Sequence, residues 1–237
     1  MMTTMSDISV RPKRKPSLVL FDMDGVLFDT MPYHADSWYT TAKAYGLEAT
    51  RDEFYLYEGQ KGSDTIRHLY KRQFGREASE AFVSEVYNHK TTLFREQTEI
   101  TLIPGIEPLI RHFKNEGIKI GVVTGSSKSN ALSRIGAYLA NDIDLNNVIT
   151  ADDCILGKPD AEPYKRGMAL FDAIPEETLV IENAPYGVEA ASKSEAFVVA
   201  VMTGPVPEKI LYDNGADVVL PDMASVMNWW VTNYDNK

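Results

Sequence analysis

The sequence predicts an α/β protein, with a doubly wound (Rossmann-like) parallel sheet and an all-helical cap inserted after the first strand. Short apolar runs alternate with segments of helical periodicity over most of the chain, which is typical of such a sheet. Between about residues 33 and 102 this alternation stops and only helical spacing remains. We therefore expect a flexible tail over 1–16, an α/β core over 17–32 and 103–237, and a helical cap over 33–102.

The composition excludes several classes of protein. The 237 residues have 44% hydrophobic and 24% charged residues, which argues against wholesale disorder. A net charge of −10 argues against nucleic acid or an anionic membrane as the main partner. No apolar run approaches the roughly 18 residues that span a bilayer, and the first 16 residues lack the apolar stretch of a secretory signal. A single cysteine, Cys154, suits a reducing compartment. We expect a cytoplasmic monomer.

The strands are predicted from apolar runs. The first, over 18–21, is short and apolar and is followed by Asp-x-Asp-Gly, as expected of a buried parallel strand. Five further runs lie at 118–123, 147–150, 178–181, 197–201 and 217–220. Ligands of an open parallel sheet bind beyond the carboxyl ends of its strands. The residues that follow each run are therefore the first candidates for a site.

The helices are predicted from apolar residues at helical spacing. In the core such segments lie at 106–115, 129–140, 161–171, 185–193, 208–214 and 226–231. Within the cap, Trp38, Ala42 and Tyr45 follow the same spacing, as do Phe82 and Val86. The flanks of the cap, 30–34 and 98–104, are its expected hinges.

Polar side chains follow the predicted strands in a pattern that suits phosphoryl transfer. In chain order they are Asp22, Asp24, Thr124, Ser126, Lys158, Glu182 and Asn183. One carboxylate of such a set can attack phosphorus while a second moves the proton. A hydroxyl and a lysine can hold the transferring oxygens, and surplus carboxylates suit Mg²⁺. Each residue alone is usually a turn, cap or surface residue, so the prediction rests on their joint position.

Four motifs resemble those of the haloacid dehalogenase superfamily. They are Phe-Asp-Met-Asp-Gly-Val at 21–26, Val-Thr-Gly-Ser at 123–126, Lys-Pro at 158–159, and Ile-Glu-Asn-Ala at 181–184 followed by Gly187. The resemblance runs from about residue 17 to residue 227. The helical insertion after the first motif is similar to the cap of the β-phosphoglucomutase-like branch.

The resemblance implies a role for each motif residue. Asp22 would be the nucleophile that becomes an aspartyl phosphate. Asp24 would protonate the leaving group and later deprotonate water, while its backbone carbonyl helps to hold Mg²⁺. Lys158 would be the third catalytic residue and would bind the transferring phosphoryl group together with Thr124, Gly125 and Ser126.

The resemblance also implies a metal site and a hinge. Glu182 would complete the Mg²⁺ site, directly or through water. His34 would couple the hinge to Asp24 when the cap closes and so contribute to substrate binding, and a packing role alone is the alternative.

Two departures from the mutase pattern change the expected substrate. The fourth motif carries the neutral Asn183 where the branch usually has an aspartate, although its carbonyl can still meet a metal or a metal-bound water. The cap segment 56–62 has Glu58 and Gly62 where the mutases carry a lysine and an arginine that grip a second phosphate. Lys61 would replace that clamp only in part, as a point charge.

Glu58 and Asn183 together resemble the pyrophosphatases of this branch. If the cap closes, Glu58 would reach the Mg²⁺ or its waters and leave little room for a sugar. We therefore expect a Mg²⁺-dependent phosphohydrolase for a small phosphate-bearing substrate, with inorganic pyrophosphate preferred. A β-phosphoglucomutase or a sugar-phosphate phosphatase is the alternative, with Glu58 a solvated cap charge and Asn183 a tolerated replacement. An alternative of another class is a catalytically silent phosphate-binding regulator, which only the neutral Asn183 favours.

Overall fold

Six parallel strands form one sheet in the computed structural model, which describes residues 10–96 and 100–235. The order across the sheet is β3-β2-β1-β4-β5-β6. The chain builds outward from β1 in one direction and, starting with β4, in the other, which confirms the predicted doubly wound α/β class. The strands are β1 (Leu18–Phe21), β2 (Lys119–Val123), β3 (Val148–Ile149), β4 (Thr178–Glu182), β5 (Phe197–Val201) and β6 (Val218–Leu220).

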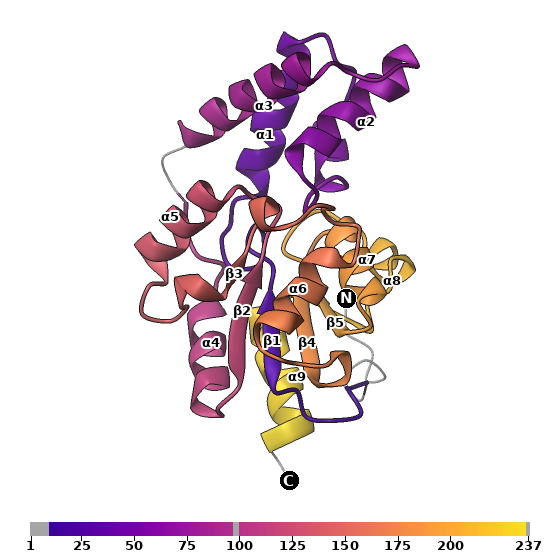
Figure 1. Ribbon diagram of the computed structural model, residues 1–237. Helices are drawn as coiled ribbons and strands as arrows, with labels where there is room; N and C mark the ends of the chain where they lie inside the picture. Colours follow the sequence, from indigo (N-terminus) through magenta and orange to yellow (C-terminus); the bar gives the residue numbers. More distant parts are fainter. Residues whose placement is uncertain (1–9, 97–99, 236–237) are drawn as a thin grey trace.

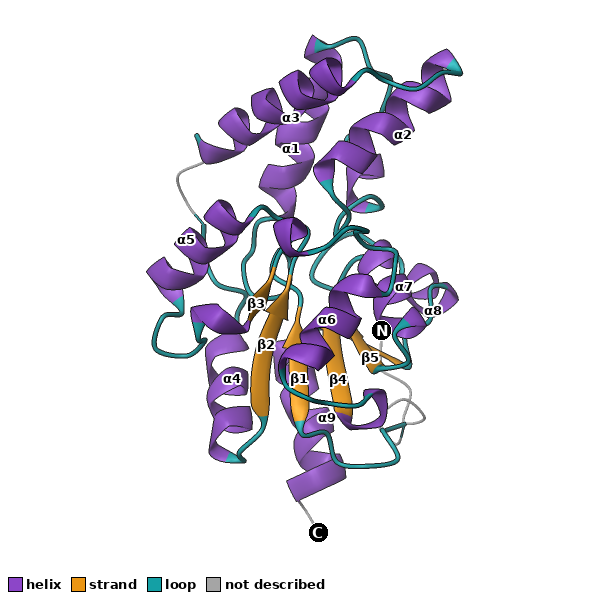
Figure 2. Cartoon of the chain, in the orientation of Figure 1, coloured by secondary structure: helices purple, strands orange, loops and turns teal. Residues whose placement is uncertain are grey.

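Helices cover both faces of the sheet (Figures 1 and 2). Val19 and Phe21 of β1 face one layer, whereas Leu18 and Leu20 face the other, because successive side chains of a strand point to opposite sides. The first layer consists of α4 (Ile106–Asn115), α5 (Lys128–Tyr138) and α9 (Met223–Trp230). The second consists of α6 (Glu162–Leu170), α7 (Pro185–Lys193) and α8 (Glu208–Asp213).

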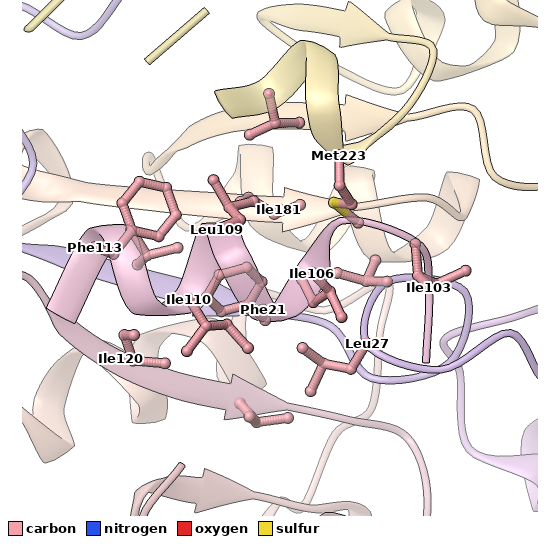
Figure 3. Close-up of a cluster of buried hydrophobic side chains, with 14 of the residues drawn as sticks. Phe21, Leu27, Ile103, Ile106, Leu109, Ile110, Phe113, Ile120, Ile181 and Met223 are labelled. Atoms are coloured by element: carbon pink, nitrogen blue, oxygen red, sulfur yellow. The ribbon is translucent and has the colours of Figure 1, made fainter. Parts of the chain in front are cut away.

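The core under α4 shows how the sequence pattern becomes packing. Figure 3 shows Phe21 and Ile181, from neighbouring strands, against the apolar face of α4. That face presents Ile106, Leu109, Ile110 and Phe113, which recur at helical spacing and are fully buried. Burial on both faces explains why the central strands are continuous apolar runs.

Two elements differ in extent from their predictions. The third strand has only two residues, because 145–147 form a short 3₁₀ helix, η3 (Leu145–Asn147), in which Asp144 accepts a hydrogen bond from Asn146 N. The last helix begins at Met223 rather than at 226, because Asp222 caps it by accepting a hydrogen bond from Ser225 N. It continues as a π-helical turn, η6 (Val231–Asp235). Two more 3₁₀ turns are η4 (Ala151–Asp153) and η5 (Pro175–Glu177).

Three helices between β1 and α4 pack together beyond the carboxyl ends of the strands (Figure 1). They are α1 (Met31–Ala44), α2 (Gly62–Phe74) and α3 (Glu80–Arg95), with the 3₁₀ turn η2 (Asp52–Tyr55) between the first two. Within 33–96 and 100–102, the described part of the expected cap, the secondary structure contains helices and no strand. Stacking of Trp38 on Phe54, with ring centroids 5.8 Å apart, joins α1 to η2. We refer to residues 31–96 as the cap.

The described part of the expected tail, residues 10–16, lies against the core. Trp229 Nε1 donates to the carbonyl of Val10 at 2.9 Å, and Lys15 forms an ion pair with Glu116 at 2.8 Å. The flexible tail was predicted from local composition, which does not register these contacts with residues distant in the sequence. The remainder of that tail, 1–9, lies outside the described residues. Within the described ranges no helix is long and apolar enough to cross a membrane.

Candidate active site

The carboxyl ends of β1 and β4 place Asp22 beside Glu182. These two strands are neighbours at the topological switch point, where the strand order reverses direction across the sheet. Asp22 N donates to Ile181 O at 3.0 Å. Lys158, from the loop before α6, joins the two carboxylates. Its Nζ lies 2.6 Å from both Asp22 Oδ1 and Glu182 Oε1 and 3.1 Å from Val123 O. The sheet thus brings together three residues that the sequence placed at strand ends.

Glu182 is completely buried and both of its oxygens are occupied by protein donors. Lys158 and the hydroxyl of Tyr164, at 2.8 Å, donate to Oε1, while the backbone N–H groups of Asn183 and Ala184 donate to Oε2 at 2.9 and 3.2 Å. With four donors satisfied, Glu182 positions Lys158 in this arrangement and has no free oxygen for direct metal contact. Tyr164 was not predicted from the sequence.

The nucleophile candidate Asp22 shares its one close cation, Lys158, with a second buried carboxylate, Glu182. Burial, followed by the negative charge of Glu182, raises the pKa of Asp22 to about 8, although Lys158 acts in the opposite direction. An additional cation at this position would favour the carboxylate form that attack on phosphorus requires.

Asp24 lies two residues away in a different environment. Its Oδ1 accepts hydrogen bonds from the hydroxyl of Thr30 at 2.6 Å and from the guanidinium of Arg134, and His34 Nε2 is 3.2 Å away. Its Oδ2 accepts from Ser126 Oγ at 3.2 Å. Burial alone would raise the pKa of Asp24, but the charges of Arg134 and His34 outweigh it and hold that pKa well below its ordinary value.

The loop after β2 lies directly under the cap. Thr124 is buried, and its Oγ1 accepts a hydrogen bond from Ser126 N at 3.1 Å. A Cβ atom at Gly125 would lie 2.6 Å from the carbonyl oxygen of Gly59 and 2.9 Å from that of Gln60. Only glycine permits this approach of the cap loop to the core loop, so the structure shows the cap closed.

Core and cap together enclose a cavity of about 50 Å³. Drug-sized ligand pockets are typically about 300–1,000 Å³, so little free space remains in the closed arrangement. The core contributes Asp22, Asp24, Thr124, Gly125 and Ser126, and the cap contributes His34, Trp38, Tyr57, Glu58, Gly59, Gln60, Gly62, Thr65, Tyr87 and Lys90.

Glu58 lines this cavity from the cap side. Its Oε1 is buried and has no hydrogen-bond partner, and burial raises the pKa of its carboxyl group. A solvated surface charge, the alternative considered for Glu58, does not fit this position.

Lys61 and Asn183 lie outside the lining of the cavity. Lys61 Nζ donates to the carbonyls of Cys154 at 2.6 Å and Ile155 at 3.0 Å, so in this structure it ties the cap to the core loop instead of providing a phosphate clamp. Its position depends on how the cap sits on the core, which spacing in the sequence does not encode. Asn183 is buried, and neither polar atom of its side chain has a partner. The amide packs against Gly25, where a Cβ would lie 2.0 Å from Nδ2.

The donors of this site suit Mg²⁺ in their chemistry. Among the described residues, no group of three or more histidine, cysteine, aspartate or glutamate side chains forms a metal cluster. However, Mg²⁺ keeps several waters and is usually bound by one or two carboxylates. The carboxylate of Asp22 and the unpartnered oxygens of Glu58 and Asn183 provide oxygen donors of that kind.

Two buried cations near Asp24 were missed by the sequence analysis. Lys90 Nζ lies 2.6 Å from His34 Nδ1 and 5.1 Å from the ring centroid of Trp38, and burial lowers its pKa to about 8. Arg134 is the ion-pair partner of Asp24. A usable signal was present, because both cations occupy the apolar face of their helix: Lys90 continues the spacing of Val83, Val86 and Phe94, and Arg134 follows Ala131.

Comparisons with known proteins identify a family and similar folds for this chain. The family model for haloacid dehalogenase-like hydrolases matches residues 19–201. Hexitol phosphatase A of Escherichia coli is 30% identical over 77% of this chain and 81% of its own, and the pyrophosphatase PpaX of Oceanobacillus iheyensis is 23% identical over 88% and 94%. The solved structure of a "putative beta-phosphoglucomutase from Bacteroides vulgatus" superposes with a TM-score of 0.88 at 37% identity, covering 92% of this chain and 88% of that one.

These relatives act on different phosphorylated molecules, so they identify the family and leave the substrate open. The family match includes the strand ends that carry Asp22 and Glu182 and the loop that carries Lys158. The fold, the paired aspartates and the lysine between two carboxylates have the same explanation: the chain belongs to the haloacid dehalogenase-like hydrolases.

Proposed function

We propose that the protein is a Mg²⁺-dependent phosphohydrolase that acts through a phosphorylated Asp22, with inorganic pyrophosphate as its substrate. One observation carries this proposal: the closed cap places the carboxylate of Glu58 in the same small cavity as Asp22 and Asp24. A third carboxylate at this position suits a site that neutralises a highly charged substrate with metal instead of arginine.

The chain's residues divide the chemistry between two half-reactions. In the first, a carboxylate oxygen of Asp22 forms a bond to phosphorus while the bond to the bridging oxygen breaks, and the second phosphate departs with the electron pair of that bond. Lys158 and the hydroxyl of Thr124 hold the oxygens of the transferring group. In the second, Asp24 accepts a proton from the attacking water, the new P–O bond forms and the Asp22–phosphorus bond breaks. The closed cap keeps other water out during both steps.

Asp22, Glu58 and the backbone carbonyl of Asp24 are the residues that would hold Mg²⁺. Asn183 lies outside the lining of the cavity and would act only through a bound water. When bound, the ion supplies positive charge that offsets the crowded carboxylates and the charge of the substrate. The pKa of about 8 for Asp22 supports such a need for a cation.

Pyrophosphate fits the cap better than a sugar phosphate does. Among the described residues that line the cavity, the cationic groups are Lys90 and, when protonated, His34, and none of the lining residues is an arginine. A mutase must grip a second phosphate, for which a bidentate arginine is the natural ligand. The cavity also offers little room for a hexose.

A sugar-phosphate phosphatase is the second candidate. The similarity to hexitol phosphatase A and to the Bacteroides vulgatus structure favours it. In that case an open cap would have to accept a longer leaving group than the closed cavity holds.

Assays with one substrate at a time distinguish a pyrophosphatase from a sugar-phosphate phosphatase and from a mutase. Purified protein with Mg²⁺ is given pyrophosphate, sorbitol 6-phosphate or β-glucose 1-phosphate, and released phosphate and glucose 6-phosphate are measured. The proposal expects the highest kcat/KM with pyrophosphate. Efficient formation of glucose 6-phosphate with negligible pyrophosphate cleavage would contradict it and indicate a mutase. The variant Asp22→Asn serves as the blank for contaminating phosphatases.

A further inference from the structure

We propose that Arg134 is a positioning residue for Asp24: it engages one carboxylate oxygen and thereby leaves the other directed toward the cavity for proton transfer. This inference rests on the proposed role of Asp24 in the phosphohydrolase reaction. It adds a residue that lies outside the four motifs, on the helix α5.

The two oxygens of Asp24 have unequal partners. Oδ1 receives the Thr30 hydroxyl and the Arg134 guanidinium, with His34 Nε2 nearby at 3.2 Å. Oδ2 has only the longer contact with Ser126 Oγ, at 3.2 Å, and Ser126 itself lines the cavity. A carboxylate held so firmly by one oxygen is restricted in rotation, and its less tightly bound oxygen is then available to the reacting groups.

Arg134 is itself fixed by aromatic rings on two sides. Its guanidinium carbon lies 5.5 Å from the ring centroid of Phe28 and 5.1 Å from that of Phe94, and the residue is 8% exposed. Phe28 belongs to the loop after β1 and Phe94 to α3 of the cap. The same Phe94 ring packs on His34 at 4.1 Å between centroids. The cap therefore covers the ion pair and shields it from water, which strengthens it.

Stability alone is a poor explanation for this pair. A buried ion pair costs desolvation energy that its attraction often does no more than offset, so apolar residues at both positions would serve packing equally well. A planar guanidinium that fixes one carboxylate oxygen is the arrangement expected where orientation matters.

The test combines Arg134 and Asp24 in a double-mutant cycle. Arg134→Gln, Arg134→Lys, Asp24→Asn and the Asp24→Asn/Arg134→Gln double variant are assayed with pyrophosphate and with p-nitrophenyl phosphate. We expect Arg134→Gln to lower kcat about 10- to 100-fold, with KM changed less than about twofold. We expect the loss to vanish in the Asp24→Asn background, because Arg134 acts through that side chain. Arg134→Lys should recover only part of kcat, since lysine keeps the charge but not the fork.

Two controls distinguish positioning from folding. Arg111→Gln removes an exposed arginine whose ion-pair partners are Glu107 and Asp142, and kcat should not change. Thermal unfolding of every variant shows whether it is folded at the assay temperature, and Arg134→Lys keeps the test valid if Arg134→Gln is unstable.

Several results would overturn the inference. An unchanged kcat in folded Arg134→Gln or Arg134→Lys would do so, as would a loss of the same size in the Asp24→Asn background. Turnover of p-nitrophenyl phosphate without cleavage of pyrophosphate would contradict the proposed substrate and still test Arg134 in full. No turnover of either phosphate by the wild type would overturn the phosphohydrolase proposal and this inference with it.

Discussion

Asp22 and Asp24 stand two residues apart on one loop and occupy opposite electrostatic environments. Asp22 shares a single lysine with a second carboxylate, Glu182, and its pKa is raised to about 8. Asp24 faces Arg134 and His34, and its pKa is held well below the ordinary value. The first environment is built from strand ends of the core, and the second from α5 and the cap hinge.

The difference shows that the protein supplies enough positive charge to keep Asp24 ionised but not enough to keep Asp22 ionised. Paired titratable groups whose environments drive their pKa values apart indicate distinct chemical roles. Asp24 already has its cations within the protein, so it is a carboxylate at neutral pH and is able to accept a proton. Asp22 needs an external cation to be a carboxylate at neutral pH, which is the part that Mg²⁺ would take.

The largest effect is expected from replacing Asp22, the proposed nucleophile. Asp22→Asn should lower kcat by about 10³-fold or more, because amide nitrogen and oxygen cannot form the acyl phosphate. The variant should remain folded, as judged by circular dichroism. Asp29→Asn, an exposed aspartate of the same loop, is the matched control and should retain activity. Normal turnover by Asp22→Asn would disprove covalent catalysis at Asp22.

A smaller effect is expected from the cap carboxylate. Glu58→Gln removes the charge and keeps the shape, and it should lower activity about 10- to 100-fold and raise the Mg²⁺ concentration for half-maximal rate. Glu77→Gln, on the exposed surface of the cap, should do neither. A Mg²⁺ titration of both variants decides the question, since an unchanged midpoint for Glu58→Gln would remove it from the metal site.

The two aspartates should give opposite pH dependences of stability when Mg²⁺ is absent. Asp22 ionises near pH 4 in the unfolded chain and near pH 8 when folded, so between these values the folded state holds the extra proton. The free energy of unfolding should therefore fall as pH rises through this window, by at most about 1.4 kcal/mol per pH unit.

The variants separate the two contributions. Asp22→Asn should be more stable than the wild type at pH 8, by about 1 kcal/mol or more, and should lose that part of the slope. Asp24 has the lowered pKa, so its stabilisation is present above about pH 4 and is lost as pH falls. Asp24→Asn should thus be less stable than the wild type at neutral pH. Urea unfolding in EDTA between pH 3 and 8 measures both contributions, the Asp22 slope above about pH 4 and the Asp24 slope below it. Equal slopes in all three proteins over the whole range would refute the contrast.

The smallest effect is expected at Tyr164. Tyr164→Phe removes one of four donors to Glu182 and should cost about 1 kcal/mol of stability and at most about tenfold in kcat. Lys158 would keep its two carboxylate partners. Tyr138→Phe, a largely exposed tyrosine, is the control. A loss as large as that of Asp22→Asn would mean that Tyr164 contacts the substrate itself.

The grouping of the residues that follow the strands could be predicted from the sequence, because the carboxyl ends of parallel strands lie at the same edge of the sheet. Any residue that follows an apolar run must lie at the same edge as the others, so Asp22, Thr124, Lys158 and Glu182 could be grouped without coordinates. The number and order of the core helices followed from the spacing of their apolar residues as well. The predicted bounds were wrong for α9, which begins at a side-chain cap, and for the strand β3, which follows a 3₁₀ turn.

The placement of cap residues could not be derived in this way. Glu58 and Lys61 are three residues apart, yet one lines the cavity and the other binds carbonyls of the loop 154–157. Arg134 and Lys90 stand out in the sequence only as cations on apolar helix faces, and it is contacts over many residues of sequence that bring them to Asp24 and His34.

The sequence by itself determined the fold class, the family resemblance and which polar residues follow the strands, because periodicity and motifs are local properties of the chain. Only the tertiary structure decided which charges face the cavity, which of them are paired, and how the pKa values of Asp22 and Asp24 diverge. These properties depend on burial and on distances of a few ångströms between separate elements, and electrostatic interactions change steeply over that range.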